Sequence, residues 1–282
     1  MEKHSVVHRL RLKVRARRAM RRVLPFVASL FLATPLASSV SSTQAHPHAT
    51  SVRMPSLQLF EANAFNSGVR QLYDDLNVAE SGLSYDVFRK AYTGFLNLKA
   101  EGKLDASREV LTVVDFEKPS TEKRLWVLDL GQKQVLFHTL VAHGHNSGEN
   151  VATNFSNENE SNMSSLGFYV TQDDYTGKHG RSLKLQGVDE GYNDNALERS
   201  VVMHGADYVS EDFIQQYGRL GRSLGCPALP MDQYAQIIDA VHGGTCLFLN
   251  GPDTSYDSEF LNTDVAAHEY ATAATASAAQ RV

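Results

Sequence analysis

Val201-Val202-Met203-His204-Gly205-Ala206 and Gly221-Arg222-Ser223-Leu224-Gly225-Cys226-Pro227 are the two stretches on which the interpretation of this chain depends. Three apolar residues lead to His204, a pattern typical of a buried strand that delivers its histidine to the rim of a sheet. Cys226 follows 22 positions later. That separation is too long for one helical face, so we expect a strand end and a returning loop to bring the two side chains together.

The pair His204 and Cys226 has the residue types of a thiol nucleophile and its base. The thiolate is the reactive form of cysteine, and a neighbouring histidine can generate it. Gly205 and Gly225 leave the backbone beside each group free of side chains, and backbone N–H groups around Cys226 would face an incoming carbonyl oxygen. The alternative is a satisfied core histidine and a small buried cysteine. The glycines and Ser223 favour the reactive interpretation.

The framing of this pair resembles a known family. His204-Gly205 followed by Ser223-Leu224-Gly225-Cys226 is similar to the signature of L,D-transpeptidases with a YkuD-type domain, in particular the murein L,D-transpeptidase catalytic-domain family. The resemblance covers roughly residues 70 to 252, and its further motifs are Leu125-Trp126-Val127-Leu128-Asp129, Val141-Ala142-His143-Gly144, Phe155-Ser156-Asn157, Ser164-Ser165-Leu166-Gly167 and Asn193-Asp194-Asn195-Ala196. Two positions depart from the commoner pattern. Leu224 replaces a second histidine, and Pro227-Ala228 replaces the apolar residue and the Arg or Asn that usually follow the cysteine.

The resemblance implies an exported cysteine acyltransferase that acts on peptidoglycan stem peptides. Cys226 is then the nucleophile, and His204 is the general base and afterwards the acid. Ser223 and Gly225 complete the predicted catalytic residues. Water in place of the acceptor amine would make the protein an L,D-carboxypeptidase, and a non-catalytic peptidoglycan-binding envelope protein is a further alternative.

Four other residues are predicted to bind substrate. The resemblance implies that His143, Ser156 and Asn157 line the cleft, whereas the Asn- and Ser-rich composition of residues 143–165 alone also fits a solvated loop. Arg222 precedes Ser223, and a guanidinium beside an acyl-transfer site can bind a peptide carboxylate through two hydrogen bonds.

A zinc peptidase is the rival hypothesis, because zinc takes His and Cys ligands. Its candidate ligands are His143, His145, His179, His204 and Cys226. No acidic residue stands at a recognisable ligand offset, and a metal site does not need the Ser-x-Gly frame. We therefore expect no metal and no cofactor.

The first 45 residues are predicted to be a signal peptide. Nine Lys and Arg within residues 1–22 precede an apolar stretch from Val23 to about Leu36, and Ala45 ends a run of small polar residues. The apolar stretch is shorter than the roughly 20 residues that span a bilayer. We expect cleavage rather than an uncleaved anchor, so that the protein has no stable membrane anchor and lies in the periplasm or cell envelope of a bacterium.

Charge and cysteine content add two expectations. The whole chain carries a formal charge of −5, and removal of residues 1–45 leaves 18 basic and 31 acidic residues, or −13. An acidic protein is a poor candidate for binding nucleic acid. Two cysteines in an exported chain usually indicate a disulfide. Cys246 lies in an apolar run typical of a core strand, however, and pairing would remove the nucleophile.

The predicted fold class is α+β and mainly β, since runs of strands rather than alternating strands and helices follow residue 109. The resemblance implies an L,D-transpeptidase β-sandwich with an N-terminal helical pair. The predicted divisions are a flexible leader at 46–65, a helical segment at 66–105, a catalytic domain at 106–252 and a disordered tail at 253–282. Strands are expected at 110–116, 124–130, 133–141, 166–170, 182–185, 200–204 and 245–250, and helices at 68–78, 84–95, 210–217 and 231–242.

Overall fold

The computed structural model describes residues 55–177 and 180–279, and the predicted signal peptide lies outside them. Eight strands form one mixed sheet in the order β3-β2-β1-β8-β4-β5-β6-β7. The predicted α+β, mainly β class is confirmed. The strands are β1 (Val110–Asp115), β2 (Leu125–Asp129), β3 (Gln134–Thr139), β4 (Gly167–Gly177), β5 (Gly180–Gly187), β6 (Val202–Gly205), β7 (Ala228–Leu229) and β8 (Cys246–Asn250).

The sheet curls until its two ends nearly meet. β3 and β7 are its outermost strands, yet the chain just beyond β3 pairs Ala142 with Ala228 of β7. The nitrogen of Ala142 lies 2.9 Å from the oxygen of Ala228. β6 and β7 run parallel, as do β1 and β8, while β2 and β3 form an antiparallel hairpin. The result is a near-barrel that brings the chain after β3 beside β7.

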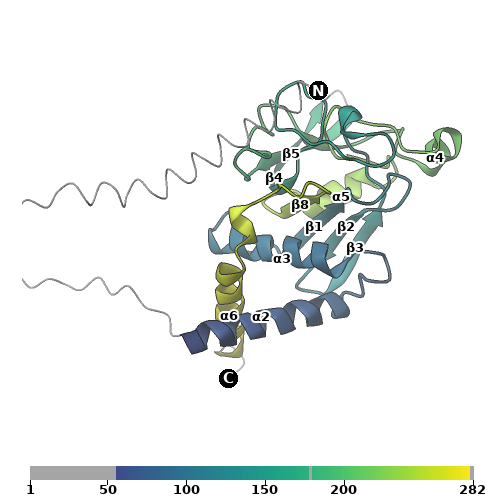
Figure 1. The fold of residues 1–282 in the computed structure, drawn as a ribbon. Coiled ribbons are helices and arrows are strands. Elements are labelled where there is room, and N and C mark those ends of the chain that lie inside the picture. Colours follow the sequence, from purple (N-terminus) through teal and green to yellow (C-terminus); the bar gives the residue numbers. More distant parts are fainter. Residues whose placement is uncertain (1–54, 178–179, 280–282) are drawn as a thin grey trace, which may run out of the picture. The chain divides into compact units, whose positions relative to one another are not determined.

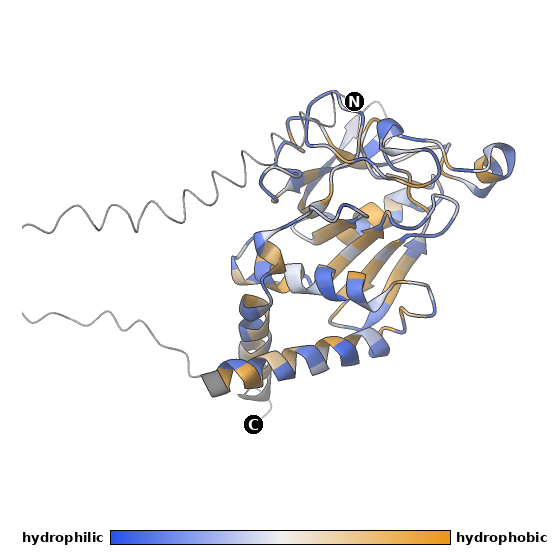
Figure 2. Ribbon diagram, in the orientation of Figure 1, coloured by the Kyte–Doolittle hydropathy of each residue, from blue (hydrophilic) through white to orange (hydrophobic). Residues whose placement is uncertain are grey.

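The inner face of the sheet encloses an apolar core around α5 (Tyr234–Val241). Ile237, Ile238 and Val241 of this helix are fully buried, as the sequence spacing predicts. They pack against inward-facing strand residues that include Val114, Val127, Leu183, Met203 and Leu247. In Figure 2, hydrophobic residues follow the central strands of the sheet.

The outer face is covered by α3 (Tyr85–Ala100), which lies across the sheet in Figure 1. Ser84 caps α3 by accepting a hydrogen bond from the nitrogen of Val87 at 3.3 Å. The apolar stripe of α3 is buried in a second core that also contains Trp126, Phe168 and Phe248. Helix α4 (Glu211–Tyr217) is capped by Ser210 and ends at Gly218, which is left-handed at φ +71°.

Two expectations about the ends of the domain are wrong. Helix α2 (Pro55–Asp75) begins inside the predicted leader, and α6 (Thr263–Ala279) forms where a disordered tail was expected. Alanine has the highest helix propensity, and its small side chain lets α6 approach α2 and α3 closely. Phe260, fully buried just before α6, anchors the segment. Asn97 of α3 donates to the carbonyl oxygens of Phe260 at 2.6 Å and Asn262 at 2.9 Å.

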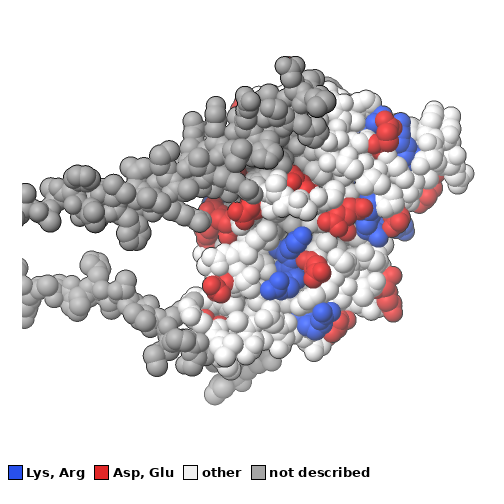
Figure 3. Space-filling model, viewed as in Figure 1, with Lys and Arg blue, Asp and Glu red and all other residues white. Residues whose placement is uncertain are grey.

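The described surface carries mixed charge. On the face drawn in Figure 3, lysine and arginine side chains stand beside aspartate and glutamate rather than forming one broad basic area. No helix within residues 55–177 and 180–279 is both long and apolar enough to cross a bilayer.

Candidate active site

Cys226 and His204 come together through the pairing of β6 with β7. His204 lies opposite Ala228 in this parallel pair. Two residues back along both strands, the nitrogen of Val202 donates to the Cys226 sulfur at 3.4 Å. The thiol therefore lies against the start of β6, and the imidazole stands two residues further along the same strand.

The backbone beside His204 fixes the tautomer of its ring. Nδ1 lies 2.9 Å from the carbonyl oxygen of Gly205. Because a carbonyl can only accept, Nδ1 carries the proton and Nε2 is the basic nitrogen. A side chain at position 205 would bring its Cβ within 2.7 Å of the Tyr234 ring. Glycine there lets β6 pass close to Tyr234 and keeps the carbonyl in place.

Ser223 and Gly225 shape the turn that presents the cysteine. The Ser223 hydroxyl donates to the carbonyl oxygen of Cys226 at 2.6 Å and accepts from the nitrogen of Gly225 at 3.1 Å. Gly225 has a φ of +124°, and a Cβ there would lie 2.8 Å from the carbonyl oxygen of Met163. Glycine is thus required at this position. The N–H group of Gly225 already has a partner in Ser223, so it is not directed at a reacting oxygen.

The two cysteines differ sharply in environment. Cys246 is fully buried in β8, as predicted, and burial raises the pKa of its thiol far above the ordinary value. Cys226 is partly exposed, and both thiols are free. Burial raises the pKa of Cys226 too, but the Val202 N–H group and the Arg199 guanidinium oppose that shift. Only Cys226 combines exposure with groups that favour its thiolate.

His143 lies behind the cysteine turn rather than on the surface of the site. Its backbone oxygen accepts from the nitrogen of Ser223 at 3.0 Å, while its side chain is fully buried. Arg124 donates to Nδ1 at 2.8 Å, which places the imidazole proton on Nε2, 3.2 Å from the carbonyl oxygen of Gly148. Burial, and then the Arg124 charge, lower the pKa of His143 to about 4. The ring therefore stays neutral and supports the turn at residues 145–149.

Acid should destabilise the fold through His143. The pKa of this imidazole is about 4 in the folded protein against 6.5 for an unperturbed histidine, so between these values the unfolded chain binds a proton that the folded protein excludes. The free energy of unfolding should fall as the pH drops through that window, by roughly 3 kcal/mol in full.

Urea unfolding at pH 7 and pH 4.5 measures this loss. His143→Gln is the matched control, because its amide can accept from Arg124 and donate to Gly148 without titrating. Equal pH dependence in the two proteins would remove His143 as the cause.

Arg222 is held by groups on the 145–149 turn. Its Nη1 lies 2.8 Å from Glu149 Oε1 and also donates to the carbonyl oxygens of His145 at 3.2 Å and Gly148 at 3.1 Å. The other oxygen of Glu149 pairs with Nε of Arg219 at 2.9 Å. Both arginines near the cysteine turn thus share one exposed carboxylate.

Ser156 and Asn157 tie the long polar loop to the segment before β6. The carbonyl oxygen of Ser156 accepts from Arg199 at 2.7 Å. Asn157 donates from Nδ2 to Asp194 at 2.7 Å, and its Oδ1 accepts from the nitrogen of Asn195 at 3.1 Å. Ser156 is buried and Asn157 is partly exposed. These bonds order the loop next to the reactive pair.

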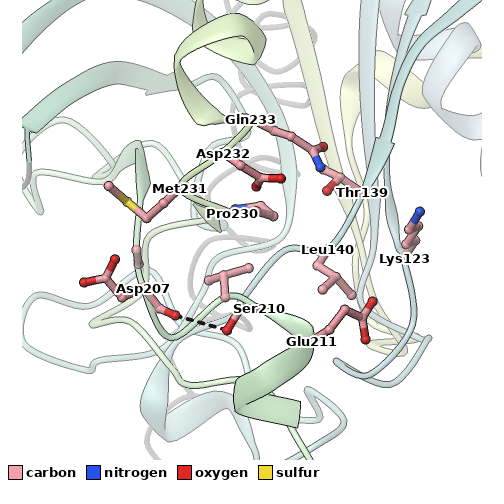
Figure 4. Close-up of a pocket in the computed structure, with 12 residues that line it drawn as sticks. Lys123, Thr139, Leu140, Asp207, Ser210, Glu211, Pro230, Met231, Asp232 and Gln233 are labelled. Carbon is pink, nitrogen blue, oxygen red and sulfur yellow. Dashed lines mark hydrogen bonds between the residues drawn. The ribbon is translucent and has the colours of Figure 1, made fainter. Parts of the chain in front are cut away.

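A cleft of about 460 Å³ lies beside the ends of β6 and β7 (Figure 4). Its apolar floor includes Leu140, Ala206 and Val209, which share a small buried cluster with Ala228. Asp207, which accepts from the Ser210 hydroxyl at 3.3 Å through its backbone oxygen, stands at its wall. Neither Cys226 nor His204 lines the cleft. The cleft lies beyond the C-terminal ends of these two strands, whereas the Cys226 sulfur contacts Val202 at the start of β6.

The part of the chain that the structure describes contains no set of ligands for the zinc hypothesis. Within residues 55–177 and 180–279, no three His, Cys, Asp or Glu side chains gather as metal ligands. His179 lies outside the described residues. The His143 ring, whose Nδ1 receives the Arg124 hydrogen bond, is committed to other partners.

The comparisons with known proteins give the family. A model of the L,D-transpeptidase catalytic domain matches residues 79–250. The chain belongs to this family. A search of the curated proteins finds no match. The family match agrees with the resemblance seen in the sequence motifs.

Several solved structures, L,D-transpeptidases among them, are distantly similar. One from Mycobacterium smegmatis is 16% identical, with 50% of this chain and 58% of that chain covered and a TM-score of 0.31. One from Stackebrandtia nassauensis is 14% identical, with 70% and 93% covered and a TM-score of 0.31. The helical cell shape determining protein Pgp2 from Campylobacter jejuni is 12% identical, with 63% and 62% covered and a TM-score of 0.34. The chain spans less than two thirds of the first of these proteins.

Sequence reasoning missed Arg199 and Glu149. Arg199 stands between the Asn-rich motif and β6, and an arginine just before a buried strand is the one local signal that could have drawn attention to it. Glu149 gives no such signal, because its pairing with Arg219 and Arg222 joins segments about 70 residues apart.

Proposed function

We propose that this protein is an exported L,D-transpeptidase that cross-links peptidoglycan stem peptides through a thioester on Cys226. The observation that carries the proposal is the position of the Cys226 sulfur against β6, two residues before His204, at a turn held by Ser223. The predicted catalytic roles of Cys226, His204, Ser223 and Gly225 belong to this proposal. So do the bacterial envelope as its location and stem peptides as its partners.

The proposed reaction has two halves. His204 Nε2 accepts the thiol proton while the sulfur attacks the carbonyl of an L-centred residue that precedes D-alanine. Collapse of the tetrahedral intermediate breaks the peptide C–N bond, and the imidazolium returns its proton to the leaving D-alanine nitrogen. An acceptor amine then loses a proton to His204 and attacks the thioester, which forms the new amide and releases the thiol.

The carbonyl oxygen of Gly205 supports the imidazole in both halves. It accepts from Nδ1 at 2.9 Å and so holds the ring in the tautomer whose Nε2 can take a proton. A neutral carbonyl stabilises the imidazolium through its dipole, the same role that an orienting carboxylate plays in other triads. Ser223 and Gly225 are positioning residues in this scheme. The Ser223 hydroxyl binds the carbonyl oxygen of Cys226 and the nitrogen of Gly225, and neither contact reaches the sulfur.

Incubation of the mature protein with purified muropeptides, followed by mass spectrometry, tests the proposal. A cross-linked product supports transpeptidation, and a trimmed tripeptide supports the L,D-carboxypeptidase alternative. No reaction supports a non-catalytic envelope protein.

A carbapenem should add covalent mass to Cys226 with or without a chelator, since a thiolate needs no metal to attack a carbonyl. Activity lost to a chelator and restored by zinc would contradict the thiol mechanism.

Arg222→Lys should lower kcat/KM if Arg222 binds a stem-peptide carboxylate. A compact ammonium cannot reproduce the planar fork, and loss of a charge-assisted contact is worth about 1.5 to 3 kcal/mol, or roughly one to two decades. Alkylation of Cys226 by uncharged iodoacetamide should stay near the wild-type rate. Steady-state kinetics and alkylation rates give the two measurements.

Glu149→Gln is the companion variant. It removes the carboxylate that Arg222 and Arg219 now share, so KM should fall if a substrate carboxylate takes its place. If Arg222→Lys slows alkylation as much as turnover, and Glu149→Gln leaves KM unchanged, the arginine supports the turn instead.

A further inference from the structure

The sulfur of Cys226 rests against the segment Arg199–Val202, just before and at the start of β6. Sγ donates to the carbonyl oxygen of Ser200 at 3.8 Å and accepts from the nitrogen of Val202 at 3.4 Å. An acceptor favours the protonated thiol, whereas an N–H donor favours the thiolate. One short segment therefore contacts both protonation states of the nucleophile.

Ser200 holds an unusual backbone conformation at this point. Its φ is +54°, in the left-handed region that a residue with a Cβ rarely adopts. Its nitrogen donates to the carbonyl oxygen of Leu197 at 3.1 Å. Strained backbone persists where the surroundings impose it, and it occurs preferentially at functional sites. Here the strained residue is the one whose carbonyl oxygen meets the reactive sulfur.

Arg199 places a positive charge behind the cysteine turn. Its guanidinium donates to the carbonyl oxygens of Ser156 and Met163, each at 2.7 Å, and also to the hydroxyls of Ser161 and Ser165. All four are uncharged acceptors. Nη2 would be 3.2 Å from a Cβ at Gly225, so the guanidinium packs directly on the residue before Cys226. No carboxylate pairs with Arg199 among the described residues.

We propose that Arg199–Val202 is a cradle for the nucleophile: the Ser200 carbonyl holds the resting thiol, and the Val202 N–H group with the Arg199 guanidinium stabilises the thiolate. Arg199 is thus a positioning residue that acts through Cys226. Its hydrogen-bond partners are neutral, so its positive charge remains available to stabilise the thiolate. The inference rests on Cys226 as the nucleophile of the proposed function.

Three titratable groups stand near the Cys226 sulfur. Arg199 packs on Gly225, the residue before Cys226, and His204 follows Val202 by two residues on β6. Tyr208 lies beyond β6, where burial and then the charge of Cys226 raise its pKa to about 12. Tyr208 therefore stays a neutral phenol at working pH. Arg199 and the imidazolium of His204 are the cations that can favour the thiolate.

The pH dependence of Cys226 alkylation by iodoacetamide tests the cradle, with peptide mass mapping to confirm the site. Arg199→Gln should raise the midpoint of the rate profile by about one pH unit or more, which slows alkylation about tenfold at pH 7. Arg199→Lys keeps a charge and should stay closer to wild type. Arg181→Gln is the control, because Arg181 on β5 is likewise held by several acceptors, among them Asp174 and Asp239. It should leave the midpoint unchanged.

Ser200→Gly tests the cradle in a variant that should keep its fold, since glycine adopts a φ of +54° without strain. Its melting temperature should equal or exceed that of wild type, while the alkylation profile should shift as the carbonyl and the following N–H group gain freedom. A folded Arg199→Gln protein with the wild-type midpoint would overturn the role of the charge. An unchanged profile in Ser200→Gly would overturn the role of the strained carbonyl.

These outcomes are separate from those of the proposed function. A protein that leaves muropeptides unchanged but shows the shifts in alkylation retains the cradle and loses the transpeptidase. A protein that cross-links muropeptides but shows no shift retains the transpeptidase and loses the cradle.

Discussion

Replacing Cys226 by alanine should abolish peptidoglycan turnover while the protein stays folded. Loss of the nucleophile in a covalent enzyme costs on the order of 10⁶ in kcat, because no other group can form the acyl intermediate. The structure gives no reason for a large loss of stability, since the Cys226 side chain is partly exposed and the turn is held through the backbone by Ser223. Product formation by mass spectrometry and thermal melting check the two halves of this expectation.

Cys246→Ala is the matched control for that variant. Cys246 is fully buried on β8, which lies between strands β1 and β4 in the sheet. Its truncation should lower the free energy of unfolding by about 1 to 2 kcal/mol through lost packing. Turnover below the melting transition should stay near the wild-type value. Equal loss of turnover in the two variants, with both proteins folded, would show that the roles assigned to the cysteines are wrong.

The strands were predictable because their signals are local. Val110–Asp115, Leu125–Asp129 and Cys246–Asn250 are short apolar runs bounded by polar turns, and each forms a strand within a residue or two of its expected limits. β7 was missed, since two residues, Ala228 and Leu229, carry no periodicity. That strand nevertheless decides the site, because its pairing with β6 places Cys226 near His204.

The C-terminal helix shows why composition gave a wrong prediction for the tail. Counting large apolar residues after Thr263 indicated disorder, yet Ala266 and Ala267 are buried because a helix packs closely when its contact residues are small. The partners of these alanines lie on α2 and α3, some 170 or more residues earlier in the chain. No local pattern in the tail contains that information.

The predicted site divides in the same way. Motif spacing was sufficient to single out Cys226 and His204, but it could not show what their neighbours do. His143 was expected to meet substrate, and its ring is instead enclosed between Arg124 and the Gly148 carbonyl. The partners of Arg222 and Arg199 lie tens of residues away in sequence, so their bonds emerge only from the folded loops.

His204→Gln should lower kcat/KM by roughly two to four decades, the usual contribution of a general base. Glutamine has a similar length and an amide that can still donate toward the Gly205 carbonyl, but it cannot take the thiol proton. His145→Gln is the control. His145 is exposed on the 3-10 turn His145–Ser147, and its replacement should leave turnover near the wild-type value. Acylation by a carbapenem should slow in His204→Gln at pH 7 and recover as the pH rises, since hydroxide then supplies the thiolate that the imidazole no longer generates. A loss that stays constant across this pH range would mean that His204 acts on the acyl intermediate or on the turn, and its role as the base that activates Cys226 would have to be withdrawn.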